Sequence, residues 1–167
     1  ILPPKLVSRV QAGEKDISFE VQTASIIFID IVEFTPWCAS LQASEVMKTL
    51  NALFTEFDRL VSKTQTITKI KCIGDCYMAA GGIFSDVNIP DLHSKEAVQF
   101  GLDSIDAVVR VNEDIGHDLK IRVGINTGGP LVAGVLGVGK PTFEIIGPVI
   151  NMAQQMEHNG VPMAVQI

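Results

Sequence analysis

The chain has 167 residues, about the length of one domain, of which 47% are hydrophobic and 19% are charged. Thirteen Lys and Arg residues against 19 Asp and Glu residues leave a formal net charge of −6. This acidic balance argues against nucleic acid or an anionic membrane as the main partner, because both favour a basic surface. The high apolar fraction and modest net charge also exclude disorder. We therefore expect residues 1–167 to form a single globular domain.

The sequence also carries information about the compartment. The longest apolar stretch, residues 24–32, is interrupted by Asp30 and is far shorter than the ~20 residues needed to cross a bilayer. No signal peptide opens the sequence. The three cysteines, Cys38, Cys72 and Cys76, are an odd number, which favours a reducing compartment over a disulfide framework. We expect a cytoplasmic domain that is a fragment of a longer protein, since the first residue is Ile.

The first half of the chain predicts one buried strand, one helix and a hairpin. Residues 24–32 are nearly all apolar and mostly β-branched, as in a buried central strand. The segment that follows is broken by Pro36 and Trp37. Apolar residues at helical spacing then predict a helix over 44–63 with Ser44 as its N-cap. Residues 66–73 and 76–80 are strand-like, and Gly74-Asp75 between them suits a type II′ hairpin turn.

The second half predicts a further helix over 94–114 and an alternating strand over 120–127. Strands at 131–136 and 143–146 follow, then a helix from Gly147-Pro148 to residue 158 and a last strand over 161–167. The order β-α-β-β-α-β predicts an α+β fold of the ferredoxin-like sandwich type. In such a fold we expect the helices to cover one face of a mainly antiparallel sheet.

Two acidic residues are candidates for metal chemistry. Asp30 interrupts an apolar strand, where a carboxylate is costly unless it is paired or coordinates a metal. Asp75 lies at the tip of the predicted hairpin and faces Asp30 if the two strands are neighbours. Two carboxylates suit Mg²⁺, which keeps several waters and binds substrate phosphates. The alternative is that Asp30 bonds backbone N–H groups at a strand end and that Asp75 is an ordinary turn residue.

Two further sequence patterns are similar to known ligand-binding motifs, but the residues around them do not fit those motifs. Residues 134–140 (GVLGVGK) are similar to a phosphate-binding P-loop, but Pro141 stands where Ser or Thr is required, and the segment lies between strands. Cys72 and Cys76 have no second close-spaced Cys/His pair, so packing is favoured over zinc.

Five segments in order resemble the successive motifs of class III adenylyl and guanylyl cyclase catalytic domains. They are residues 28–35 (FIDIVEFT), 69–78 (KIKCIGDCYM), 120–128 (KIRVGINTG), 134–141 (GVLGVGKP) and 147–153 (GPVINMA). The resemblance covers nearly the whole chain. It implies the class III cyclase fold, with a C-terminal helix and hairpin that lie beyond Ile167. It also implies a dimer, homodimeric or heterodimeric with another cyclase domain, in which each active site lies between two chains.

The resemblance assigns roles to the residues that match the motifs. It implies that Asp30, Asp75 and the backbone of Ile31 hold two Mg²⁺ or Mn²⁺ ions per active site. Backbone N–H groups of residues 32–35, including Phe34 and Thr35, match a phosphate cradle at a helix N-terminus. Arg122 matches a phosphate-binding arginine, although a solvated strand charge is the alternative.

The resemblance also predicts the base. Lys71 occupies a position that carries Lys in adenylyl cyclases and Glu in guanylyl cyclases, and its partner position, usually Asp or Cys respectively, is Glu144. Lysine can only donate hydrogen bonds, so it suits adenine N1, and a carboxylate accepts from the adenine amino group. ATP is therefore the expected substrate, although the longer Glu144 could shift the base or simply pair with Lys71.

One catalytic position departs from the family. Asn151 matches the residue that orients the ribose, but Gln155 stands where the family has an arginine that stabilises the transition state. We expect an adenylyl cyclase that makes 3′,5′-cyclic AMP and pyrophosphate, slowed by Gln155. The alternatives are a half that needs a different partner, a degenerate regulatory module and, less favoured, a guanylyl cyclase. Membrane contact is expected only through other parts of a membrane-attached protein, with this domain in the cytosol.

Overall fold

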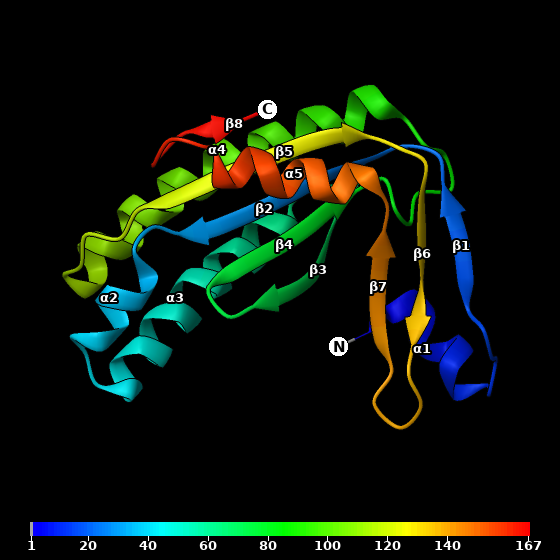
Figure 1. The fold of residues 1–167 in the computed structure, drawn as a ribbon, viewed down its shortest axis with the longest axis horizontal. Helices are drawn as coiled ribbons and strands as arrows, with labels where there is room; N and C mark the ends of the chain where they lie inside the picture. Colours follow the sequence, from blue (N-terminus) through cyan, green and yellow to red (C-terminus); the bar gives the residue numbers. More distant parts are fainter. Residues whose placement is uncertain (1) are drawn as a thin grey trace.

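The larger of two sheets is built around β2 (Ala24–Ile31), the buried strand predicted from the sequence. The computed structural model describes residues 2–167. In it, β2 pairs antiparallel with β4 (Cys76–Gly81) on one side and β5 (Ile121–Gly128) on the other. β3 (Ile67–Ile73) and β8 (Val165–Gln166) complete the order β3-β4-β2-β5-β8 (Figure 1). The strands expected at 24–32, 66–73, 76–80 and 120–127 are thus present, with no boundary shifted by more than one residue.

Two long helices cover one face of this sheet. They are α3 (Ala43–Ser62) and α4 (Pro90–Ile115), which lie behind the sheet in Figure 1. Between them and the sheet is the first core, whose largest fully buried side chains include Phe57, Tyr77 and Phe100. Residues 27, 29 and 31 of β2 point into this core, as the two-residue period of a strand requires.

The third predicted helix lies on the opposite face, which departs from the expected one-sided arrangement. α5 (Pro148–His158) crosses β5 and β2 on the side facing the viewer in Figure 1. The close approach depends on Gly124 in β5: a Cβ there would lie 2.0 Å from the backbone N of Glu157 and 2.7 Å from the backbone O of Ala153. The fold class is otherwise as predicted, an α+β structure with both helix and sheet layers.

A second sheet stands at one end of the molecule. It consists of β1 (Ser18–Val21), β6 (Leu131–Leu136) and β7 (Thr142–Ile146), all antiparallel in the order β1-β6-β7. α1 (Pro4–Gln11) lies beside it (Figure 1). Phe19, Phe84 and Phe143 form an aromatic cluster in this region, with ring centroids 5.4 to 6.5 Å apart. This second core is continuous with the face of the large sheet that carries α5.

Three elements were not predicted: α1, β1 and α2 (Phe34–Ala39). Pro4 opens α1, because a proline at the first helical position lacks only an N–H that would be unbonded anyway. Pro36 likewise lies in the first turn of α2, where it is tolerated. The last strand was predicted too long. Met163 has φ of 60°, and its N–H bonds Ile121 O at 2.8 Å, so only residues 165–166 pair as a strand, parallel to β5.

No helix of the described residues combines the length and apolar character needed to span a membrane.

A buried network of hydrogen bonds connects α4 to the large sheet. His93 is fully buried, with its Nδ1 2.7 Å from Ser25 Oγ and its Nε2 3.2 Å from Asn88 Oδ1. Asn88 Nδ2 donates to Thr23 O at 2.6 Å, so Asn88 Oδ1 is free to accept from His93 Nε2–H. His93 Nδ1 then accepts from Ser25, whose Oγ is also 2.7 Å from Thr127 Oγ1. The network fixes a neutral imidazole, and burial lowers the pKa of His93.

Because the pKa of His93 is lowered on folding, the unfolded chain takes up this proton first as the pH falls. We expect the free energy of unfolding to decrease below pH 6.5, by up to about 1 kcal/mol per pH unit from this group. Urea titrations between pH 7.5 and 5.5 measure it. A His93→Gln variant is expected to be less stable at pH 7.5 but to show a flatter pH dependence. Parallel losses in both proteins would contradict the assignment.

Candidate active site

The fold brings Asp30 and Asp75 together at one end of the large sheet. Ile29 pairs with Tyr77 across β2 and β4, so the β3–β4 turn that carries Asp75 lies beside Asp30. The turn has the predicted form, since Gly74 has φ of 60° while Asp75 is not among the residues with positive φ. The carboxyl group of Asp75 is close enough to that of Asp30 for the two groups to influence each other electrostatically.

The two carboxyl groups share a confined space. Burial, followed by the interaction with the neighbouring Asp30 carboxyl group and its negative charge, raises the pKa of Asp75 to about 6. The backbone N–H groups of Asp75 and Ile31 donate to the Asp75 carboxylate and oppose this shift. A divalent cation between the carboxylates would favour their ionised forms. Residues 2–167 contain no cluster of three or more potential His, Cys, Asp or Glu ligands. Mg²⁺, however, needs only one or two carboxylates, because water and phosphate oxygens supply its other ligands. The donor set fits such an ion.

Ile31 could take part only through its backbone. Its side chain is buried in the first core, and its N–H faces the Asp75 carboxylate. The predicted phosphate cradle follows directly in the chain. Glu33, with φ of 54°, turns the chain from β2 into α2, and the first N–H to bond back is that of Trp37, to Glu33 O at 3.2 Å. The N–H groups of Phe34 and Thr35 therefore belong to the unpaired first turn of a helix.

Arg122 lies between two acids. It is the register partner of Asp30 across β2 and β5, and its Nη2 is 3.8 Å from Asp30 Oδ2. Its Nε donates to Glu157 Oε1 at 3.1 Å. Glu157, on α5, is only 3% exposed, and the sequence analysis missed it. The signal was present, because Glu157 continues the i, i+4 stripe of Val149 and Ala153, where an apolar residue is expected.

Cys76 lies close to the same acids. Burial, followed by the charges of Asp30, Glu157 and Asp75, raises the pKa of Cys76 to about 12. The thiol therefore stays neutral at physiological pH and packs against the second core, in agreement with the packing role expected for it.

Lys71 and Glu144, the two residues matched for base recognition, form an ion pair with each other, 2.7 Å apart from Nζ to Oε2, as the alternative interpretation of Glu144 allowed. Lys71 lies on β3 just after a bulge at residue 70, and Glu144 lies on β7 of the second sheet. The bulge adds one residue and so changes the direction of the side chains that follow it. The pair bridges the outer edges of the two sheets and lines a cavity of about 710 Å³, whose walls also include Leu2, Pro3 and Phe143.

Asn151 and Gln155 are exposed on the outer face of α5, one turn apart. Within residues 2–167, no hydrogen bond or ion pair joins either side chain to Asp30, Asp75 or Lys71. The single chain thus brings together the acids and Arg122 as one group, and Lys71 with Glu144 as a second. Asn151 and Gln155 form a third group that faces away from the sheet.

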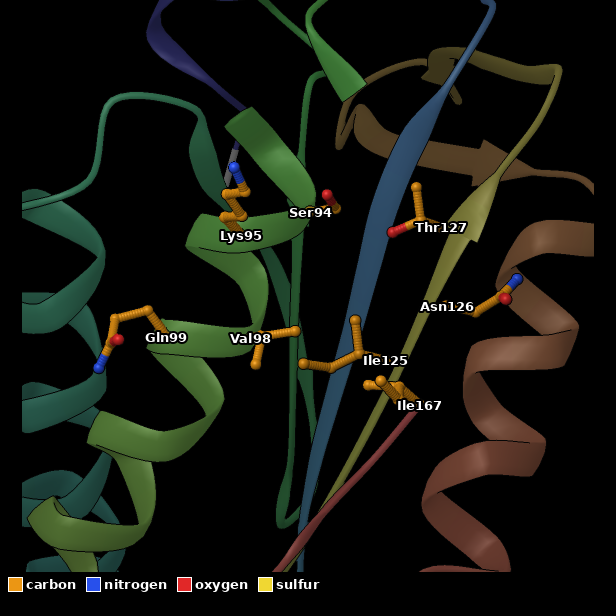
Figure 2. A pocket seen from close by; sticks show the side chains of 8 residues that line it. All are labelled: Ser94, Lys95, Val98, Gln99, Ile125, Asn126, Thr127 and Ile167. Atoms are coloured by element: carbon orange, nitrogen blue, oxygen red, sulfur yellow. The ribbon is translucent and has the colours of Figure 1, made fainter. Parts of the chain in front are cut away.

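Another cavity lies apart from all of these residues. It has a volume of about 590 Å³ and opens between α4 and the edge of β5. Figure 2 shows its side chains, with Lys95 and Gln99 on α4 and Asn126 and Thr127 on β5. None of the predicted catalytic, metal or base-contacting residues lines it.

Comparison with known proteins identifies the family. Residues 18–167 match the family described as the adenylate and guanylate cyclase catalytic domain, so the chain belongs to that family, the class III nucleotidyl cyclases. Guanylate cyclase soluble subunit beta-2 of Rattus norvegicus is 34% identical over 168 residues, which cover 100% of this chain and 24% of the relative. Receptor-type guanylate cyclase Gyc76C of Drosophila melanogaster is 33% identical over 171 residues, covering 100% and 11%. The chain therefore spans about a quarter or less of these relatives.

Solved structures agree on the fold. The guanylate cyclase domain of RhGC from Catenaria anguillulae, in complex with GTP, superposes with a TM-score of 0.79 at 31% identity, covering 88% of this chain and 78% of that one. The adenylyl cyclase CyaB from P. aeruginosa gives a TM-score of 0.80 at 24% identity, covering 89% and 76%, and shows the fold alone. The fold is thus that of a class III cyclase catalytic domain, as the sequence motifs predicted.

If Asp30 and Asp75 hold a divalent cation, Mn²⁺ offsets the burial and the negative charge of Asp30, which raise the pKa of Asp75. We expect millimolar Mn²⁺ to raise the melting temperature of the wild-type protein at pH 7.5, and to leave Asp30→Asn and Asp75→Asn unchanged. Asp106→Asn, which removes an exposed acid on α4, is the matched control and is expected to keep the wild-type response. An equal shift in all four proteins would count against a metal site here.

Proposed function

We propose that the chain is the catalytic domain of an adenylyl cyclase, which converts ATP into 3′,5′-cyclic AMP and pyrophosphate at the interface of a dimer. The observation that carries the adenylyl assignment is the Lys71–Glu144 pair, 2.7 Å apart beside a cavity of about 710 Å³. A lysine can donate to adenine N1, whereas guanine N1 carries a proton and needs an acceptor. Glu144 can accept from the adenine amino group.

The remaining residues account for the other parts of the nucleotide. Asp30, Asp75 and the Ile31 backbone would hold Mg²⁺ or Mn²⁺, which when bound supplies activation of the ribose 3′-hydroxyl and neutralises charge on the leaving pyrophosphate. Arg122 and the first N–H groups of α2 offer donors to the phosphates. Asn151 of the partner copy would orient the ribose. The acids and Asn151 lie on different faces of one chain, which supports a site shared between two chains.

Gln155 sets the expected rate. A glutamine amide can donate a hydrogen bond to the reacting phosphate but carries no charge, so the transition state loses electrostatic stabilisation. One preorganised donor typically contributes ~10²–10³ in rate. Gln155 also supports a second arrangement, in which this domain pairs with a different cyclase domain that supplies the missing arginine.

Guanylyl cyclase activity is the second candidate, favoured by the names of the relatives at 33–34% identity. Against it stand Lys71 and Glu144. A rhodopsin-guanylyl cyclase with converted specificity has been solved in complex with ATPαS, with a TM-score of 0.78 and 31% identity to this chain. The catalytic core of that guanylyl cyclase therefore accommodates an adenine nucleotide once its specificity is converted.

The domain is expected to work in the cytosol as part of a longer, membrane-attached protein. The odd number of cysteines and the acidic surface support the cytosolic site. The small share that the chain covers of its relatives, 11% for the receptor-type Gyc76C, supports a larger multidomain protein.

The substrate prediction is tested with the full-length protein, Mn²⁺ and either ATP or GTP. We expect cyclic AMP from ATP and a kcat/KM for GTP at least tenfold lower, since a site built for one hydrogen-bond pattern leaves polar groups unpaired with the other. The Asp30→Ala variant gives the blank. Lys71→Glu combined with Glu144→Cys is expected to shift the preference toward GTP. If the wild-type protein made mainly cyclic GMP from GTP, the adenylyl assignment would be overturned.

Replacing Gln155 by Arg restores a positive charge on the exposed face of α5. We expect kcat for cyclic AMP formation to rise by about 10², with KM for ATP changing less, because the charge acts on the transition state. Gln154→Arg adds the same charge one residue away and is the matched control. Unchanged turnover in Gln155→Arg would show that the arginine comes from a different partner chain or that the domain is regulatory.

A further inference from the structure

Glu157 is a buried acid to which none of the proposed steps assigns a role. Its side chain is 3% exposed, near the end of α5. Oε1 accepts from Arg122 Nε at 3.1 Å, and Oε2 lies 3.5 Å from His158 Nδ1. A buried carboxylate is costly unless it is paired, so the burial of Glu157 depends on its contact with Arg122.

The backbone holds Glu157 and Arg122 in fixed relative positions. Arg122 is paired in the sheet on β5, and Gly124 two residues later lets α5 pack so closely that a Cβ would lie 2.0 Å from Glu157 N. The carboxylate therefore stands beside the strand that carries the guanidinium. It is a rigid acceptor, which a surface acid on a mobile side chain is not.

Arg122 has a second acid within reach. Asp30 is its register partner across β2 and β5, yet the guanidinium stays 3.8 Å from Asp30 Oδ2, beyond hydrogen-bond distance. The shorter contact, to Glu157, engages Nε and leaves the two Nη groups for other acceptors. If Glu157 lost its charge, Asp30 would become the strongest acceptor for Arg122.

We propose that Glu157 is a positioning residue that holds Arg122 by its Nε and so keeps the guanidinium off Asp30. Both oxygens of Asp30 then remain available to a divalent cation, and the Nη groups of Arg122 remain available to nucleotide phosphates. This inference rests on the proposed roles of Asp30 and Arg122, but not on the choice between ATP and GTP.

The first test measures metal binding without turnover. Mn²⁺ affinity of the full-length protein, read from the electron paramagnetic resonance signal of free Mn²⁺, is expected to fall about tenfold in Glu157→Gln. The amide keeps the shape and one acceptor oxygen but removes the charge. Glu157→Asp keeps the charge and is expected to retain affinity within threefold of wild type. Glu113→Gln, an exposed acid on α4, is the control for the loss of one negative charge.

A double-mutant cycle separates positioning from general stabilisation of α5. In an Arg122→Gln background no guanidinium can move onto Asp30, so Glu157→Gln is expected to leave the Mn²⁺ affinity unchanged. Equal losses in both backgrounds, or a folded Glu157→Gln variant with wild-type affinity, would overturn the proposal. If Glu157→Gln does not fold, Glu157→Asp carries the test, and a tenfold loss of affinity with the charge retained would also overturn it.

Kinetics give an independent readout when the protein is active. Glu157→Gln is expected to raise KM for the preferred nucleotide about tenfold with kcat within about threefold, because Arg122 binds phosphates in substrate and transition state alike. A fall in kcat alone would contradict this role. A protein with no cyclase activity fails the proposed function, yet its Mn²⁺ affinities still decide whether Glu157 positions Arg122.

Discussion

The contact between α5 and Gly124 is the constraint on which the rest of the site depends. Any side chain at residue 124 would meet the backbone of Glu157 and Ala153 at 2.0 to 2.7 Å, and no rotamer can relieve a clash with backbone. Because glycine stands there, α5 lies directly on β5. This docking buries Glu157 beside Arg122 and turns Asn151 and Gln155 outward. One missing side chain therefore positions a buried acid on one face of the helix and two exposed amide side chains on the other.

The two faces of the large sheet divide stability from chemistry. The face under α3 and α4 is apolar apart from two polar features. One is the hydrogen-bond network of His93, and the other is the hydroxyl of the buried Tyr77, which donates to Asp58 Oδ1 at 2.7 Å. The other face is only partly covered, by α5 and the second sheet, and it carries Asp30, Arg122 and Cys76. Asp30 keeps partial solvent contact there, and the Arg122 guanidinium lies 3.8 Å from its carboxylate. The alternation of residues along β2 thus places core side chains on one face of the strand and the metal-binding candidate Asp30 on the other.

The sequence predicted the parts whose signals are local. The strand containing Asp30 and the Gly74-Asp75 turn follow from periodicity and turn chemistry, and the structure places both as expected. Lys71 and Glu144 are 73 positions apart, and only the family resemblance matched them to each other. The side of the sheet on which α5 lies depends on Gly124 meeting residues about 30 positions away, and no local pattern specifies such a contact. Glu157 was missed for a related reason: its partner Arg122 is 35 residues distant, and only the acid at an apolar helical position hinted at it. α2 was missed because Pro36 suggests a break, although a first-turn proline is compatible with a helix.

The distribution of groups within one chain favours a shared site over a self-contained one. Asp30, Asp75 and Arg122 face one side of the sheet end, while Asn151 and Gln155 point away from the sheet on the outer surface of the same α5 helix. A nucleotide held by the acids of one copy can meet Asn151 only from another copy, unless α5 leaves the sheet. Leaving would expose Glu157 without Arg122 and open the Gly124 contact, which are costly changes. In the proposed dimer the helix is therefore a fixed element between two sites. Its inner face would position Arg122 for the site of its own chain, and its outer face would contribute Asn151 and Gln155 to the site of its partner.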